Sequence, residues 1–189
     1  NMLEPQNYAE MQDKTVCLKN TQYPDDNLCK IYGLEDIRLY EYNDKVRFIA
    51  TNRNYSPHIN TNRMIVGDYD VESMAYLNCK VVEPPQYTWC EKNWIPIVKS
   101  TETFADATKD EEYFIYKWSP MEIGQIDPTN NTLRSVKTHM NTVNVPDFHR
   151  VRGSTVFIEL DEFSGQQAGL ERNGGLIGVV HFSEEKSPR

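Results

Sequence analysis

At 189 residues and 22.0 kDa the chain is long enough to bury a hydrophobic core, and one domain is expected. Hydrophobic residues (39%) and aromatic residues (11%) are those of a globular protein, which excludes a disordered chain. The net charge of −8, with basic residues scattered along the sequence, disfavours nucleic acid and anionic membranes as partners, and no apolar run approaches the roughly 20 residues of a membrane-spanning helix.

The cysteines and histidines are too dispersed to form a ligand set. Four residues of each type occur, and the spacing of Cys17, Cys29, Cys79 and Cys90 fits no zinc pattern. Reduced, structural thiols are therefore expected, and no metal or organic cofactor is predicted. The amino end resembles no signal peptide, so the sequence favours a soluble, cytoplasmic protein.

Short segments rich in β-branched and aromatic residues begin at Asp36 and predict strands. Helical periodicity is nearly absent. The first predicted unit (residues 35–83) holds "DIRLYEY" (36–42), a turn at Asn43-Asp44, "KVRFIATN" (45–52), "RMIVGDYDV" (63–71) and "AYLNCKVVE" (75–83). The second (91–140) holds "NWIPIVKS" (93–100), an acidic loop, "EYFIYKWS" (112–119), "MEIGQID" (121–127) and "TLRSVKTH" (132–139). The third (150–189) holds "STVFIEL" (154–160), a Gly-rich loop and "GLIGVVHF" (175–182).

The units recur with a period of about 60 residues, and four strands per unit are typical of a β-propeller. Strand spacing alone leaves a β-sandwich open, because its strands also recur at short intervals. We predict an all-β propeller that occupies residues 1–189 as a single domain. Since a propeller closes with four or more blades and this chain supplies two and a half to three, other segments are expected to complete it.

Each unit opens with polar side chains. The first has Glu35, Asp36 and Arg38, the second has Glu91, Lys92, Asn93 and Trp94, and the third has Arg150, Arg152 and Ser154. In a propeller the first strand of each blade lines the central channel, so these side chains are expected to converge. Acids, bases and an aromatic ring around one cleft suit a sugar, whose hydroxyls need donors and acceptors and whose apolar face stacks on an aromatic side chain.

"GLEDIRL" resembles the Gly-x-Glu-Asp-x-Arg element of the five-bladed propeller glycosidases, especially the mannoside phosphorylase and β-mannosidase group, although Ile37 stands where proline is usual. The ordered set "GLEDIRLY", "CEKNWIPI", "YFIYKWSPMEIGQI", "RGSTVFIEL" and "GLIGVVHFSEEKSPR" is similar to propeller domains associated with glycosyltransferases, including those of large DNA viruses. The resemblance covers roughly residues 31–189. It implies a carbohydrate partner, a glycosyltransferase domain or the rest of the propeller as protein partner, and, for a viral protein, the host cytoplasm or the virion as location.

The resemblance also implies roles for single residues. Asp36 takes the place of the catalytic acid, Arg38 that of the arginine in the same element, and residues 91–93 those that open the next blade. Arg150, Arg152 and His181 are candidate counterparts of the residues that hold an attacking inorganic phosphate.

Two reaction types stay open. Inverting hydrolysis needs two carboxyl groups about 6.5–9.5 Å apart, which Asp36 and Glu91 would supply from neighbouring strands, whereas Glu35 and Asp36 point to opposite faces of a regular strand. Phosphorolysis needs no second carboxylate, and Arg152 or Lys92 would position the phosphate. The remaining predicted substrate contacts are Glu35, Arg38, Asn93, Trp94, Ser154 and His181.

A structural interpretation competes with this one. Glu35 and Asp36 could neutralise Arg38 and Lys92 in an ion-pair network, and Trp94 and His181 could be core or strand-end residues. The chain would then be a non-catalytic structural or assembly protein, such as a virion component, that keeps the propeller fold.

Overall fold

The computed structural model describes residues 12–13, 34–53, 55–58, 60–98, 112–140, 150–160 and 175–182. Within them the regular secondary structure is β-strand, apart from a single 3₁₀ residue at Arg150, which confirms the predicted all-β class. No helix in the described part of the chain has the length and apolar character needed to cross a membrane.

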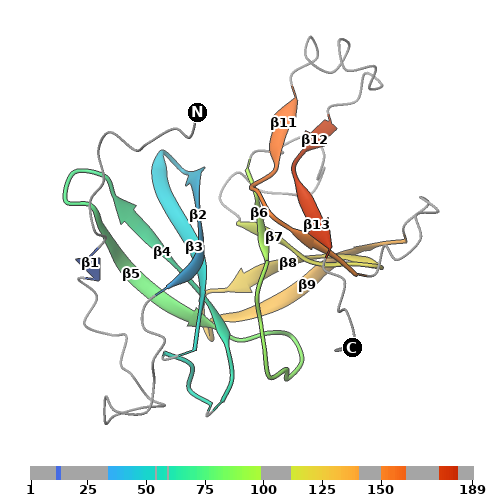
Figure 1. Ribbon diagram of the computed structural model, residues 1–189, viewed down its shortest axis with the longest axis horizontal. Helices are drawn as coiled ribbons and strands as arrows, with labels where there is room; N and C mark the ends of the chain where they lie inside the picture. The colour runs from blue at the N-terminus through green and yellow to red at the C-terminus, as the bar shows by residue number, and fades with distance from the viewer. Residues whose placement is uncertain are drawn as a thin grey trace, which may run out of the picture.

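The first sheet is an antiparallel meander with one added strand (Figure 1). Its strand order is β1-β5-β4-β3-β2, and β1 pairs with β5 in parallel. The bounds are β1 (Gln12–Asp13), β2 (Glu35–Tyr42), β3 (Lys45–Asn52), β4 (Arg63–Asp70) and β5 (Ala75–Val82). The four strands predicted for the first unit are thus confirmed.

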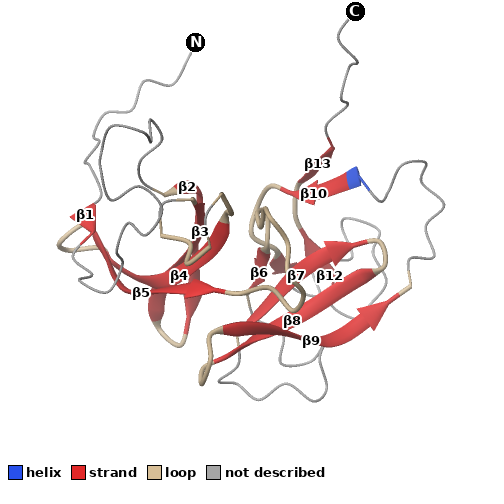
Figure 2. Cartoon of the chain, turned by 90° about the horizontal axis from the view of Figure 1, so that it is seen from below, coloured by secondary structure: helices blue, strands red, loops and turns tan. Residues whose placement is uncertain are grey.

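A second antiparallel sheet lies beside the first and has the order β6-β7-β8-β9 (Figures 1 and 2). The bounds are β6 (Ile95–Ile97), β7 (Tyr113–Trp118), β8 (Met121–Asp127) and β9 (Thr132–His139). The predictions for β8 and β9 are correct to the residue. β6 is shorter than the predicted 93–100: Asn93, two residues before it, has a left-handed φ of 62° that interrupts the extended backbone, and residues 99–100 lie outside the described part of the chain.

The third unit forms two short antiparallel pairs. β10 (Val151–Gly153) pairs with β13 (Val180–Phe182), and β11 (Ile158–Leu160) pairs with β12 (Gly175–Ile177). The prediction of two continuous strands, 154–160 and 175–182, is therefore wrong. Gly178 sits at the break, where an added Cβ would lie 2.7 Å from the ring of Phe157, so the close approach of that ring requires glycine.

The turn between β2 and β3 follows the prediction. Asn43 and Asp44 have φ of 49° and 57°, which is the left-handed geometry of a two-residue turn that matches the twist of a hairpin. Asn and Asp tolerate this conformation better than other residues with a side chain.

Two clusters of buried side chains cover the two faces of the first sheet. One lies between the two large sheets and comprises Tyr40, Ile49, Met64, Val66, Val82, Trp94, Phe114 and Leu133. The other lies on the far face of the first sheet and comprises Phe48, Ala50, Ile65, Tyr76 and Cys79. Because β3 and β4 are buried on both faces, their sequences read as continuous apolar runs and not as alternating ones.

Contacts between units join the sheets in chain order. The rings of Tyr40 and Phe114 meet edge to face at 6.3 Å, and a parallel bridge links Glu83 to Thr132. A further parallel bridge links Ile97 to Phe157 in the third unit. The described strands form four separate sheets and none closes on itself, so the five-bladed propeller stays a prediction.

Candidate functional site

The first strand of the first unit begins with a β-bulge. Glu35 pairs with Thr51 but Arg38 pairs with Ile49, so β2 contains one more residue than its partner between these pairs. Asp36 lies within this bulge and has a left-handed φ of 53°. Glu35, Asp36 and Ile37 are all exposed. The regular alternation that we assumed for Glu35 and Asp36 is thus broken by the bulge.

Arg38 connects the openings of all three units. Its guanidinium donates to Asn93 Oδ1 at 3.2 Å, to Gly153 O at 3.1 Å and to Ser154 O at 3.3 Å. It also donates to Asp36 O at 3.0 Å. Burial lowers the pKa of Arg38, and the charge of Asp36 opposes that shift. Arg38 thus meets the second opening through the side chain of Asn93 and the third through the carbonyl groups of residues 153 and 154, at a point that we call the Arg38 junction (Arg38, Asp36, Asn93, Gly153 and Ser154).

Another predicted residue, His181, extends the Arg38 junction through Ser154. Ser154 Oγ and His181 Nδ1 lie 2.6 Å apart, and His181 pairs in register with Arg152 across β10 and β13. Arg152 is exposed, and its guanidinium donates to the carbonyl of Val151 at 2.8 Å. The hydroxyl and the imidazole therefore belong to the same cluster as Arg38.

Close packing fixes the third unit against the second at the Arg38 junction. An added Cβ on Gly153 would lie 2.0 Å from Cγ1 of Ile95, so a side chain at this position would displace the first strand of the second sheet. Glycine at position 153 therefore lets the carbonyl groups of residues 153 and 154 approach Arg38.

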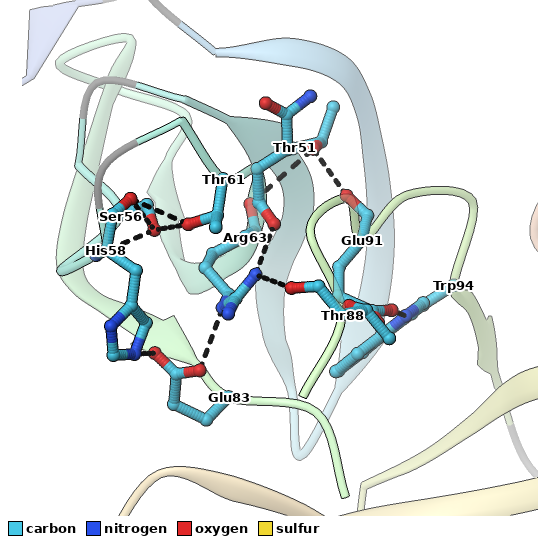
Figure 3. A network of polar contacts seen from close by, with 10 residues as sticks. Thr51, Ser56, His58, Thr61, Arg63, Glu83, Thr88, Glu91 and Trp94 are labelled. Carbon is cyan, nitrogen blue, oxygen red and sulfur yellow. Dashed lines mark hydrogen bonds and ion pairs between the residues drawn. The ribbon is translucent and has the colours of Figure 1, made fainter. Parts of the chain in front are cut away.

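Glu91, the second predicted catalytic carboxylate, points into the core (Figure 3). The residue is 5% exposed, one carboxylate oxygen accepts from Trp94 Nε1 at 2.8 Å, and the other accepts from the hydroxyl of Thr88. Burial raises the pKa of Tyr116, and the nearby charge of Glu91 adds to the shift. This carboxylate is held by donors of the protein itself, which favours a structural role.

The other predicted residues of the second opening differ in exposure. Trp94 is 0% exposed and meets Tyr116 edge to face at 5.4 Å, so its ring has no free face for a sugar. Asn93 is buried, and its side-chain oxygen accepts from Arg38. Lys92 is exposed. Of this opening, Asn93 takes part in the Arg38 junction, whereas Trp94 belongs to the core.

A buried arginine that the sequence analysis missed fixes the loop before Glu91 (Figure 3). Arg63 is 0% exposed and donates to Glu83 Oε2 at 2.8 Å, to Asn62 O at 2.9 Å and to Thr88 O at 3.0 Å. Its sequence signal is a charged residue directly before the apolar run "MIVG". A charge at the start of a doubly buried strand needs a partner, and Glu83 supplies it.

A second missed network joins the two large sheets. Glu112 accepts from Tyr40 Oη at 2.8 Å and from Arg47 Nε at 2.9 Å. Burial raises the pKa of Tyr40, and the charge of Glu112 raises it further. Burial alone would lower the pKa of Arg47, but Glu112 holds it above its usual value. The sequence gives no signal for this network because Glu112 lies more than sixty positions from both Tyr40 and Arg47.

No group of three or more metal-ligating side chains occurs among the described residues. Cys79 and Cys90 form no disulfide, whereas Cys17 and Cys29 lie outside the described part of the chain.

Comparison with known proteins gives no relative. No family model, no curated protein and no solved structure matches the chain. The resemblance to propeller glycosidases therefore stays a prediction, and the geometry of the Arg38 junction carries the functional reasoning.

Proposed function

We propose that the chain is part of a five-bladed, glycosidase-like propeller that binds carbohydrate at the Arg38 junction. The observation that carries the proposal is the meeting of three distant segments at Arg38, with the exposed acid Asp36 beside it. Sugar hydroxyls both donate and accept hydrogen bonds. The carboxylate of Asp36 and the hydroxyl and imidazole of Ser154 and His181 offer partners of both kinds.

For a catalytic role, the geometry favours phosphorolysis over two-carboxylate hydrolysis. Glu91 is buried and its two oxygens are engaged, so it is poorly placed to activate water. Asp36 would act alone as the acid, and its proton would pass to the leaving glycosidic oxygen as the anomeric C–O bond breaks. Inorganic phosphate would form the new C–O bond on the opposite face of the ring, held by Arg152 or Lys92.

The test combines a glycan array with a phosphorolysis assay on manno-, gluco- and xylo-configured substrates. Asp36→Asn removes the acid but keeps the size of the side chain, and Glu41→Gln is the matched control because Glu41 is an exposed acid near the other end of β2. We expect Asp36→Asn to lower turnover by about 10²–10⁴-fold and Glu41→Gln to leave it within about twofold. If the wild-type chain neither binds nor cleaves any of these sugars, the carbohydrate function is abandoned.

A structural or assembly role is the second candidate. It is favoured by the extent to which Arg38 and Glu91 are satisfied within the protein, since charges that only stabilise a fold are paired in this way. It would be supported if no sugar binds and the Asp36→Asn variant assembles like the wild type. As a partner, a glycosyltransferase domain or the remaining blades would suit either role.

A further inference from the structure

The connection between the two large sheets presents two exposed aromatic rings. Tyr87 and Trp89 are each 73% exposed, whereas Trp94 in the same connection is 0% exposed. Large aromatic side chains bury much surface when a partner is available, so two rings left in solvent on one short loop are an unusual feature. The stacking surface that we predicted at Trp94 is thus absent there but present five residues earlier.

The backbone that carries these rings is held in place. The carbonyl of Thr88 accepts from Arg63 at 3.0 Å, and the carbonyl of Trp89 accepts from the amide of Asn62 at 3.0 Å. The hydroxyl of Thr88 donates inward to the buried Glu91 (Figure 3). Thr88 therefore faces the interior between two residues that face solvent. Rings on a fixed backbone lose little conformational entropy when they bind a ligand.

The neighbours of Tyr87 are polar. The imidazole of His58 meets its ring edge to face at 6.0 Å and lies 3.6 Å from a carboxylate oxygen of Glu83, and the guanidinium of Arg63 lies 5.6 Å from the ring centre. A docking site for an apolar protein surface is a contiguous hydrophobic patch, which these surroundings do not form. Separate rings among carboxylate and imidazole groups match a sugar, which has an apolar ring face and polar edges.

The loop also borders the acidic end of β2. Thr51, which pairs with Glu35, donates its hydroxyl to the carbonyl of Glu91 at 2.8 Å. Burial raises the pKa of Cys90, and the charge of Glu35 is among the further causes. Cys90 and Glu91 directly follow Trp89, so the end of the loop that carries the two rings lies beside the start of β2.

We propose that Tyr87 and Trp89 form an aromatic platform that binds a carbohydrate chain next to the Arg38 junction. This inference rests on the proposed function and names the ligand more closely, as an oligosaccharide long enough to contact both places. Each ring stacks against the apolar face of one pyranose unit, while the reducing or non-reducing end reaches Asp36.

The experiment measures binding to the full chain by calorimetry. The probes are mannotetraose, cellotetraose and xylotetraose, each compared with its monosaccharide. The variants are Tyr87→Ala, Trp89→Ala and Asp36→Asn, and Phe182→Ala is the matched control because Phe182 is another exposed aromatic residue, in β13. Trp94 is buried and Trp118 is half-buried, so the difference in acrylamide quenching between the wild type and Trp89→Ala reports on Trp89, and a bound sugar should protect it. Circular dichroism confirms that each variant is folded.

We expect the loss of one ring to weaken tetraose binding by about tenfold and to change monosaccharide binding little. Phe182→Ala should bind like the wild type. If tetraose affinity is the same in both ring variants while Asp36→Asn abolishes it, the platform is refuted and the proposed function stands. If the wild type binds none of the sugars, the proposed function itself fails. If Trp89→Ala leaves sugar affinity unchanged but dissolves a self-associated form, the rings are a protein contact and the platform is again refuted.

Discussion

Replacement of Glu91 distinguishes a structural carboxylate from a catalytic one. Glu91→Ala removes the acceptor of two donors, the buried indole N–H of Trp94 and the half-buried hydroxyl of Thr88. A buried donor without a partner costs about 1–3 kcal/mol, so two of them lower the free energy of unfolding by about 3 kcal/mol in total. Glu91→Gln keeps one acceptor oxygen and should cost about 1 kcal/mol.

The assay is urea unfolding at neutral pH, monitored by far-UV circular dichroism. For a chain of this size, 3 kcal/mol corresponds to a fall in Tm of about 6–12 °C. Glu35→Ala is the control, because Glu35 is an exposed acid at the opening of the first unit and its loss should change stability by less than about 0.5 kcal/mol. If Glu91→Ala is as stable as Glu35→Ala, the structural role is refuted.

Two further predictions concern Arg38 and Asp68. Arg38→Met should lower the free energy of unfolding by about 2 kcal/mol, because the buried acceptors at Asn93 and Gly153 lose a charged donor. The control is Arg152→Met, which replaces an exposed arginine and should change the free energy of unfolding by less than about 0.5 kcal/mol. Equal urea midpoints for the two variants would contradict this. Burial alone would raise the pKa of Asp68, but hydrogen bonds from Asn78 and Arg47 hold it below its usual value. Since the folded-state pKa is depressed, this stabilisation is present above about pH 4 and is lost as the pH falls through the folded pKa. Asn78→Ala should therefore reduce the dependence of the free energy of unfolding on pH between about pH 4 and 2. An unchanged pH profile would contradict this.

The strands were predictable because their signals are local. β-branched and aromatic runs separated by turn residues give the bounds of β3, β8 and β9, and Asn43-Asp44 specifies the first hairpin. These features depend on short stretches of sequence and on the order in which the strands occur.

Side-chain exposure at the site was not predictable in the same way. Trp94 and Trp89 lie five positions apart on one connection, yet the first is buried and the second is in solvent. Trp94 is buried with its indole N–H bonded to Glu91, whereas the loop that carries Trp89 is held by the hydrogen bond from Arg63, at the start of β4, to the carbonyl of Thr88. Partner choice across such distances leaves no local pattern in the sequence.

The two carboxylates near the openings of the first and second units reach opposite environments. Asp36 and Asn93 both have left-handed backbones at the openings of their strands, but the bulge in β2 turns residues 35–37 to solvent, whereas residue 91 turns inward. An acid that protonates a leaving group has to be accessible to the ligand. An acid that accepts hydrogen bonds from Trp94 and Thr88 has to stay in the protein interior. A single chain can therefore use one carboxylate for binding or catalysis and the other for packing. For this reason we expect Asp36→Asn to reduce function at unchanged stability and Glu91→Ala to reduce stability first.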